Sequence, residues 1–262
     1  MIRLDQALVE RGLCDSRERA KRAVLAGQVR INGQPACKPS DAVKPDDALA
    51  LDAGEKYVSR GGHKLEHALQ HFQLDVNGLV AIDLGASTGG FTDCLLQRGA
   101  ARVFAVDVGR GQLAWKLRND RRVVVMEKTN ARFLKPEDFY SVGPVSRSLT
   151  RSANDAICPG VDLITIDCSF ISLRKILPAA VPLLKQGGKI VALIKPQFEA
   201  GKAEADKGRG VITDTAIHDR VLRELQDFVS ARAGLCWRNV IESPLLGPAG
   251  NKEFLVLIEK AG

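Results

Sequence analysis

From Leu79 to the end of the chain, short apolar runs alternate with segments of helical periodicity. Seven runs carry the strand pattern, and they span residues 79–84, 102–108, 123–128, 161–170, 188–196, 236–244 and 253–260. Helical stretches separate most of them, which is typical of an open, mostly parallel sheet covered by helices. The last two runs are joined only by residues 245–252, so we expect an antiparallel hairpin at the edge of the sheet.

The N-terminal part of the chain follows a different pattern. Apolar residues at helical spacing predict a short helix over residues 4–12. A second helix is predicted from its N-cap Ser16 to a stop at Gly27. Asn32-Gly33 between two short runs then predicts a tight hairpin turn. The sequence therefore predicts a small α+β unit of two helices and short strands that ends near Leu51.

These patterns divide the chain. We predict a first domain over residues 1–54, a linker over 55–62 and a second, α/β domain over 63–262. Glycines flank the linker, which suits a short hinge. Residues 140–160 are polar and rich in serine, which favours a surface loop of little core value.

Size, charge and cysteine content narrow the class of protein. The 262 residues suffice for one large domain, one small domain and a sizeable core. The net charge of +7 fits a partner rich in phosphate without proving one. The six cysteines include no C-x-x-C pair, which argues against a zinc site or a redox dithiol.

The chain shows no targeting or membrane segment. Charged residues such as Arg3, Asp5 and Glu10 interrupt any apolar leader at the N-terminus. No uncharged run approaches the ~18 residues that a membrane span requires. Unpaired cysteines fit a reducing compartment. We therefore expect a soluble, cytoplasmic protein, and we expect it to be a monomer.

The second predicted helix is strongly basic. It carries Arg17, Arg19, Lys21 and Arg22, and a charge run of this kind taken alone is best interpreted as a solvated helix face. The order of helix, turn, basic helix and small strands nevertheless resembles the small RNA-binding domain first seen in ribosomal protein S-four. The resemblance implies that this helix and the adjacent strand, with Arg30, contact an RNA backbone, which positions RNA without reading its bases.

Three histidines in the next predicted helix raise the question of a metal. His63, His67 and His71 are spaced four residues apart, so they share one helical face. No acidic or cysteine ligand is evident nearby. An exposed helix face that also carries Lys64 is the better interpretation, and we expect no metal.

A glycine-rich loop follows the first strand of the α/β domain. The strand ends at Asp83, and residues 85–90 lead into a helix. Such a loop permits positive φ and close backbone approach to a ligand. A P-loop is excluded because no Gly-Lys-Ser/Thr follows, and Ser87 replaces the second glycine of a dinucleotide fingerprint. A dinucleotide, S-adenosylmethionine and a purely structural turn remain open, although Asp83 suits a ligand that bears a cation.

Charged residues end several of the later runs. Asp107 ends the second strand and could accept both hydroxyls of a ribose. Asp167 and Lys195 end two further strands, where open α/β sheets build their sites. Glu253 starts the final strand, and Lys64 precedes the sheet. Each residue alone is more simply a strand-end charge that faces water, but together they form a Lys–Asp–Lys–Glu set.

This set resembles that of the RrmJ/FtsJ class of ribose 2′-O-methyltransferases, and the whole chain resembles the TlyA family, which is also called hemolysin-like. The motifs that carry the resemblance are RLDQALVERGL (3–13), KYVSRGGHKL (56–65), DLGASTGGFTDCLL (83–96), AVDVGRGQLAWKLR (105–118), IDCSFISL (166–173), LIKPQFE (193–199) and GNKEF (250–254). The resemblance implies a Rossmann-like class I methyltransferase domain after the RNA-binding domain. It also implies S-adenosylmethionine-dependent 2′-O-methylation of cytidine in ribosomal RNA within ribosomal subunits, in 23S rRNA and, by the full N-terminal domain, also in 16S rRNA.

The site residues follow from these motifs. We expect Asp83 on the amino group of the cofactor and Asp107 on its ribose. The loop backbone at its methionine end comprises Gly85, Ala86, Ser87, Thr88, Gly89 and Gly90, and the adenine neighbours are Thr129, Asn130 and Ala131. The residues expected to contact RNA are Arg3, Arg17, Arg19, Lys21, Arg22, Arg30, Arg60, Lys202, Lys207 and Arg209.

The catalytic set suggests a mechanism. A ribose hydroxyl is a weak acid, so a group must take its proton as the methyl group is transferred. Lys195 is our candidate base, and we expect a nearby Lys64 to disfavour its protonated form. Asp167 would act in the opposite direction while it orients either the Lys195 ammonium or the methyl donor, and Glu253 would hold Lys64 or the hydroxyl. Alternatively, the lysines only position the hydroxyl and water removes the proton.

Two other function classes and one regulatory hypothesis remain. A membrane-lytic protein would need an amphipathic or spanning segment, which the sequence does not show. A ribosome-binding protein with an inactive methyltransferase fold would not need all four charged residues. We also hypothesise that residues 55–62 must reorganise before the cofactor binds well.

Overall fold

The computed structural model describes residues 1–52, 55–139, 160–201, 204, 208 and 210–262. Contacts divide the chain into two compact units, Met1–Lys56 and Tyr57–Gly262. Each unit has a separate apolar core, and each is described here by itself. The predicted loop over residues 140–160 lies, except for Gly160, outside the described residues.

The first unit is a small α+β domain. Its elements are β1 (Ile2–Arg3), α1 (Leu4–Glu10), α2 (Arg17–Leu25), β2 (Val29–Ile31), β3 (Gln34–Pro35), β4 (Ala42–Val43) and β5 (Leu49–Leu51). The side chain of Ser16 accepts a hydrogen bond from the N–H of Arg19, so it caps α2 as the sequence predicts. Asn32 and Gly33 both have positive φ, 52° and 80°, which confirms the tight turn between β2 and β3.

The second unit alternates strands and helices. Its elements are α3 (Gly61–His71), β6 (Val80–Leu84), α4 (Gly90–Gln97), β7 (Arg102–Val106), α5 (Trp115–Arg118), β8 (Val123–Met126), η1 (Ala131–Phe133), η2 (Pro136–Phe139), β9 (Val161–Ile166), α6 (Leu173–Ala180), η3 (Val181–Leu183), β10 (Leu184–Ile194), α7 (Pro196–Glu199), α9 (Thr215–Ser230), β11 (Leu235–Glu242) and β12 (Phe254–Lys260). All seven predicted strand segments are present.

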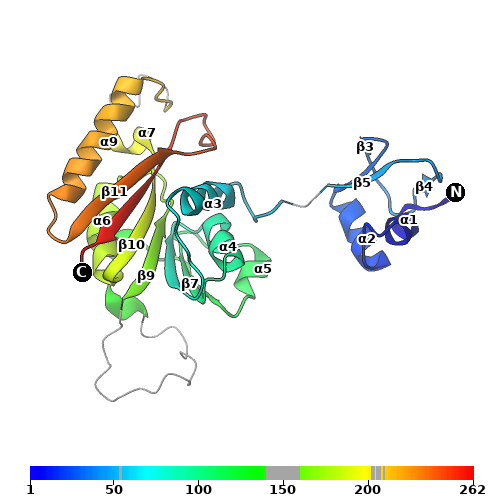
Figure 1. The fold of residues 1–262 in the computed structure, drawn as a ribbon, viewed down its shortest axis with the longest axis horizontal. Helices are drawn as coiled ribbons and strands as arrows, with labels where there is room; N and C mark the ends of the chain where they lie inside the picture. The colour runs from blue at the N-terminus through cyan, green and yellow to red at the C-terminus, as the bar shows by residue number, and fades with distance from the viewer. Residues whose placement is uncertain (53–54, 140–159, 202–203, 205–207, 209) are drawn as a thin grey trace, which may run out of the picture. The chain divides into compact units, whose positions relative to one another are not determined.

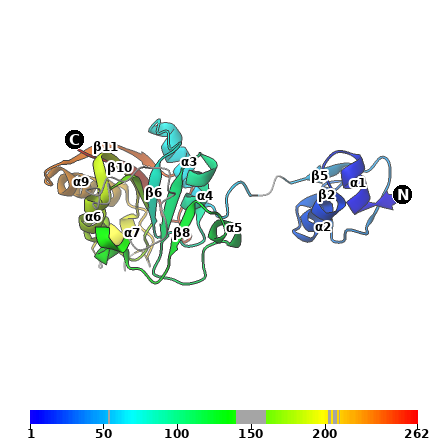
Figure 2. The ribbon, with the colours of Figure 1, turned by 90° about the horizontal axis from the view of Figure 1, so that it is seen from below.

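Within the described residues, these strands form one sheet of seven in the order β11-β12-β10-β9-β6-β7-β8. The ladders from β10 through β8 are parallel, whereas β12 runs antiparallel to both β10 and β11. This is the predicted Rossmann-like arrangement with its C-terminal antiparallel hairpin. Figures 1 and 2 show α3, α4 and α5 on one side of the sheet and α6 and α9 on the other.

Two apolar layers hold the helices to the sheet. Alternate strand residues face opposite sides, so Ile82 packs in the layer under α6 and α9, and Ala81 packs in the layer under α3 and α4. Both faces of the central strands are therefore buried, which explains why the sequence shows continuous apolar runs there.

The segment just before α3 packs within the second unit. Tyr57 is 1% exposed, and a Cβ on Gly62 would come within 2.2 Å of its ring. The N–H of Val58 donates to the carboxylate of Asp93 on α4 at 2.8 Å. The segment 57–62, which the sequence suggests as part of a linker, is thus anchored by an aromatic side chain that glycine leaves room for.

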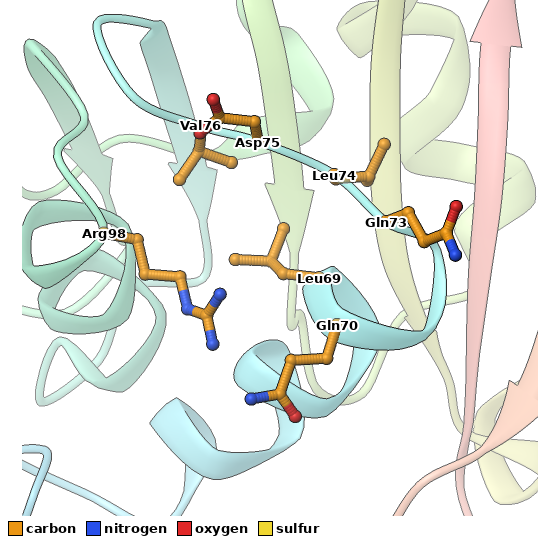
Figure 3. A pocket seen from close by; sticks show the side chains of 7 residues that line it. All are labelled: Leu69, Gln70, Gln73, Leu74, Asp75, Val76 and Arg98. Atoms are coloured by element: carbon orange, nitrogen blue, oxygen red, sulfur yellow. The ribbon is translucent and has the colours of Figure 1, made fainter.

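The parallel strands all end at one edge of the sheet, and the chemistry-bearing residues lie there. A hollow of about 410 Å³ lies instead at the opposite edge, where the strands begin (Figure 3). Its lining residues are Leu69, Gln70, Gln73, Leu74, Asp75, Val76 and Arg98. None of them belongs to the predicted site, so this hollow does not mark the candidate active site.

Candidate active site

Neighbouring parallel strands bring Asp167 and Lys195 together. Asp167 directly follows β9 and Lys195 directly follows β10, and the two strands are paired up to Ile166. The Nζ of Lys195 lies 2.7 Å from Oδ1 of Asp167 and donates to the hydroxyl of Ser169 at 2.9 Å. The lysine side chain is nearly buried, at 10% exposure. Two of the three ammonium donors are thus used by the protein.

A second ion pair joins Lys64 and Glu253. The Nζ of Lys64, on α3, lies 2.5 Å from Oε2 of Glu253, and the side chains are 9% and 1% exposed. Glu253 immediately precedes β12. Such a buried pair requires close geometry to offset desolvation, and removing one partner leaves an uncompensated charge.

Strand register brings the two pairs to one place. Ile194 of β10 is paired with Phe254 of antiparallel β12. The next residue of one strand, Lys195, and the preceding residue of the other, Glu253, therefore leave the sheet at the same point. All four predicted charged residues gather there. The structure pairs each lysine with its own carboxylate, which is one of the alternatives that the sequence analysis gives for each carboxylate.

The buried side chain of Asp83 connects three elements, β6, α4 and β9. Its carboxylate is fully buried and accepts hydrogen bonds from Thr92 of α4 at 2.7 Å and from Thr165 of β9 at 2.9 Å. Thr165 is its cross-strand neighbour. Burial raises the pKa of Asp83 to about 6, although both hydroxyls act in the opposite direction. Asp83 thus connects its strand to α4 and β9 through both hydroxyls, and its expected contact with a cofactor amino group stays a prediction.

The glycine loop uses most of its own N–H groups. Gly85 and Ala86 donate to the carbonyl of Val106, and Gly89 donates to the carbonyl of Ala86. The N–H of Ser87 donates to the carboxylate of Asp107 at 2.8 Å. A phosphate would need these donors. A cationic ligand needs oxygen acceptors instead, which suits S-adenosylmethionine better than a nucleotide.

The glycines of the loop mainly make room for protein. Gly85 has a φ of +85°, and its Cβ would lie 2.7 Å from the backbone oxygen of Asp167. A Cβ on Gly90 would lie 2.9 Å from the backbone nitrogen of Gly62 at the start of α3. The close approach that the sequence suggests is thus made to neighbouring strand and helix backbones.

Asp107, the residue expected to hold the cofactor ribose, contacts the glycine loop. Its two carboxylate oxygens accept from the N–H groups of Ser87 and Gly109, at 2.8 and 2.7 Å. Each oxygen keeps a second lone pair that a ribose hydroxyl could use. The N–H of Thr129 donates to the carbonyl of Asp107 at 2.9 Å.

The three predicted adenine neighbours differ in exposure. Thr129 is half-buried, Asn130 is exposed, and Ala131 is buried in the core of the unit. The side chain of Asn130 accepts from the N–H of Arg132 at 3.0 Å, so it caps η1. Thr129 and Asn130 therefore present side chains to solvent beside Asp107, and Ala131 presents none.

An exposed aromatic residue beside the ion pairs escapes sequence analysis. Phe170 lies three residues after Asp167, is 89% exposed and has a φ of +64°, which is rare for a bulky residue. Its ring centroid lies 5.1 Å from that of Phe198 on α7. Nothing in the sequence signals a positive φ at a phenylalanine. Water-facing aromatic rings at strained positions are typical of functional sites.

A buried aspartate organises the basic surface of the first unit. Asp5 is buried, and its carboxylate contacts Arg3 at 3.0 Å and Arg17 at 3.1 Å. These hydrogen bonds, that of Arg3 above all, hold the pKa of Asp5 below its ordinary value. Both guanidinium groups remain half-exposed, so they are oriented and still accessible.

The other predicted RNA contacts are more scattered. Ion pairs join Arg19 to Asp15, Lys21 to Glu18 and Arg30 to Asp52, and Arg22 and Arg60 are exposed. Lys202, Lys207 and Arg209 lie outside the described residues. Among the residues that the structure does describe, no group of His, Cys, Asp and Glu could hold a metal, and no helix has the length and apolarity to cross a membrane.

Comparison with known proteins agrees with this geometry. Residues 57–260 match the FtsJ-like methyltransferase family, and residues 2–49 match the S4 domain. The 16S/23S rRNA (cytidine-2′-O)-methyltransferase TlyA of Mycobacterium tuberculosis is 47% identical over 260 residues, which cover 97% of this chain and 88% of that protein. Hemolysin A of Brachyspira hyodysenteriae is 40% identical, with 97% and 98% covered.

A solved structure from Streptococcus thermophilus, which bears a hemolysin name, is 43% identical and has a TM-score of 0.70 over 99% of this chain and 88% of that one. The family match spans most of the chain, and its limits coincide with the second unit of the structure. The chain therefore belongs to the FtsJ-like methyltransferase family and carries an S4 domain ahead of the methyltransferase domain.

Proposed function

We propose that the chain methylates the ribose 2′-oxygen of cytidine in ribosomal RNA, with S-adenosylmethionine as the methyl donor. The observation that carries the proposal is the meeting of two lysine–carboxylate pairs, Lys195–Asp167 and Lys64–Glu253, at the carboxyl edge of a methyltransferase sheet. The relatives named as rRNA methyltransferases support the choice of substrate. We further propose that the protein acts in the cytoplasm on ribosomal subunits, and on 23S as well as 16S rRNA.

The residues at this edge fit the proposed cofactor. S-adenosylmethionine, when bound, supplies a methyl group on a positively charged sulfur. Asp107 would hold its ribose hydroxyls, with Thr129 and Asn130 beside the base. The carbonyl oxygens of Ala86, Thr88 and Gly89 each accept a hydrogen bond within the protein and keep a second lone pair that the methionine end could use.

Lys195 is our candidate for contact with the ribose hydroxyl. Asp167 and Ser169 occupy two of its donors and fix its position, which leaves one for the 2′-oxygen. Holding the hydroxyl in line with the methyl group supplies much of the rate. As a neutral amine, Lys195 would give its two N–H groups to Asp167 and Ser169 and take the hydroxyl proton on its lone pair; as an ammonium, it would position the hydroxyl with the third N–H while water takes the proton. Lys64, held by Glu253, adds a second positive charge where negative charge develops on the oxygen.

Two further features support RNA as the substrate. Phe170 offers an exposed ring beside Lys195 on which a base can stack, a contact that proteins commonly make with unpaired RNA bases. In the first unit, Arg3 and Arg17 are held by Asp5 with their guanidinium groups accessible to phosphate.

The test is methyl transfer from radiolabelled S-adenosylmethionine to purified 30S and 50S subunits that lack their native ribose methylations. Replacing Lys195 by alanine should lower the rate about 10²- to 10⁴-fold, because the group that contacts the hydroxyl is removed. Lys185→Ala is the matched control, because Lys185 forms a 2.8 Å pair with Asp162 on the same two strands at the opposite edge. The control should keep the wild-type rate.

A second variant separates the two roles of Lys195. Arginine keeps the positive charge but cannot accept a proton, so activity in Lys195→Arg would assign a positioning role. Label on neither subunit, despite cofactor binding, would contradict the proposed substrate. Failure to bind the cofactor would favour a ribosome-binding protein with an inactive fold, and lysis of erythrocytes by the purified chain would favour the function in the hemolysin names.

A further inference from the structure

The turn between β11 and β12 carries Glu253 at its end and is closed by hydrogen bonds. The N–H of Ser243 donates to the carbonyl of Glu253 at 2.8 Å, where the two strands separate. Further along, the N–H of Gly247 donates to the carbonyl of Asn251 at 2.9 Å, and the N–H of Gly250 donates to the carbonyl of Gly247 at 2.9 Å. The turn therefore has a defined shape around the Glu253 side chain.

Gly247 lies directly against the carboxylate of Glu253. It is buried, and a Cβ built on it would lie 2.5 Å from Oε1 and 3.2 Å from the carboxyl carbon. Its φ lies outside the left-handed region, unlike the +87° of Gly250 in the same turn. The backbone at Gly247 is thus open to any residue, and space for the carboxylate is what requires glycine there.

The turn cannot easily move away from Glu253, because a buried asparagine anchors it. Oδ1 of Asn251 accepts from the N–H of Ile212 at 2.9 Å, and Nδ2 donates to the carbonyl of Gly210 at 2.8 Å. His218 of α9 contacts the carbonyl of Ile212 at 3.0 Å through Nε2. Breaking these buried hydrogen bonds would leave polar groups unpaired, so the turn is held in place next to Glu253.

We propose that Gly247 is a positioning residue whose bare Cα holds the Glu253 carboxylate against Lys64. This inference rests on the proposed function of the Lys64–Glu253 pair. One carboxylate oxygen faces Lys64 and the other faces Gly247. A methyl group at position 247 would have to push the carboxylate by about 1 Å to reach an ordinary van der Waals contact. A displacement of that size distorts the 2.5 Å contact between Glu253 and Lys64.

The experiment compares Gly247→Ala with Gly250→Ala in the full chain. Gly250 lies in the same turn and has nothing within 4 Å of an added Cβ, so alanine there adds only backbone strain, at a φ of +87°, and does not touch Glu253. Gly247→Ala should lower kcat for methyl transfer to ribosomal subunits about a hundredfold, with KM for RNA and Kd for S-adenosylmethionine unchanged. Gly250→Ala should keep the wild-type kcat.

A double-mutant cycle tests whether Gly247 acts through Glu253. In a Glu253→Ala background the space is free, so Gly247→Ala should cause no further loss of kcat and a smaller loss of unfolding free energy in urea. Effects that add independently in both measurements, or a raised KM for RNA with kcat unchanged, would overturn the inference. If the wild-type chain transfers no methyl group, the proposed function fails, and the unfolding cycle still tests the contact.

Discussion

At the scale of single residues, Asp83 is a buried carboxyl group at the end of the strand that precedes the glycine loop. Its carboxylate is enclosed by Thr92, Thr165 and the strand end, and burial raises its pKa to about 6. Below its unfolded pKa of 3.8 the group is neutral in both states, and its favourable contribution to folding is complete. As the pH rises through about 6, the folded state must ionise a buried group, and that contribution is lost.

Asp83→Asn should therefore change the pH dependence of stability. The amide has the shape of the acid, can exchange hydrogen bonds with both threonine hydroxyls and does not ionise. Relative to this variant, wild-type protein should lose about 3 kcal/mol of unfolding free energy between pH 4 and pH 7. Urea denaturation at several pH values measures the difference. Parallel curves for the two proteins would show that Asp83 does not titrate in this range.

The charged residues of the site were predictable, and their partners were predicted as alternatives: Lys195 or the methyl donor for Asp167, and Lys64 or the hydroxyl for Glu253. Lys64, Asp167, Lys195 and Glu253 stand at strand ends or beside a motif, and parallel strands must end at one edge. The meeting of the two pairs depends on the register of β12 against β10, and sequence does not encode that register locally. Phe170 was missed for a related reason, because a positive φ at an aromatic residue arises from tertiary packing.

At the scale of elements, the glycine loop follows β6 and packs against the end of β9 and the start of α3. Gly85 passes against the backbone of Asp167, and Gly90 passes against Gly62. The loop thereby fixes the strand that ends in a catalytic candidate and the helix that carries Lys64. The sequence predicted a loop that requires small residues near a ligand; the structure shows that protein backbone also lies close to it, and the ligand contact stays a prediction. The run of small residues in the sequence shows that something lies close to the loop, but only the fold shows which backbone segments lie there.

Two alanine substitutions separate backbone strain from steric contact, one at Gly85 and one at Gly111 in the loop after β7. Gly111→Ala adds only strain, because its φ is +72° and nothing lies within 4 Å of the new Cβ. We expect it to cost about 1–2 kcal/mol of unfolding free energy. Gly85→Ala has similar strain and also meets the Asp167 backbone, so it should cost about 1–3 kcal/mol more. Equal losses of unfolding free energy for the two variants, measured by chemical denaturation, would mean that the Asp167 backbone moves aside at no energetic cost.

At the scale of the whole molecule, the chain is two units with separate cores. The first presents arginines oriented by a buried aspartate, and the second contains the candidate active site. The seven strands, the hairpin and the two helices ahead of them were all predictable, because strong periodicity survives in any context. The packing of Tyr57 in the second unit was not, because one aromatic residue in a short segment of mixed polarity has no periodic signal.

Removing residues 1–56 should weaken binding to ribosomal subunits and leave the second unit folded. Each RNA phosphate that the first unit neutralises should steepen the dependence of log K on log salt by about 0.7 to 0.9. Binding of the full and shortened chains at several salt concentrations therefore counts these phosphates. If both chains gave the same slope of log K against log salt, the first unit would not contact RNA phosphates.

The same shortened chain tests the hypothesis that residues 55–62 must reorganise before the cofactor binds well. The measurement is the affinity of residues 57–262 for S-adenosylmethionine, compared with that of the full chain. The hypothesis predicts weaker binding by the shortened chain, because the first unit can no longer act on the segment before α3. Equal affinities would contradict it.

The packing of the glycine loop also bears on how sequences of this kind are read across evolution. Because Gly85 and Gly90 accommodate neighbouring backbone, a descendant that lost methyl transfer would still need both glycines in order to fold. Selection for stability alone would preserve the motif. The glycine loop is therefore a marker of architecture, and a pseudoenzyme would be recognised by decay at Lys64, Asp167, Lys195 or Glu253.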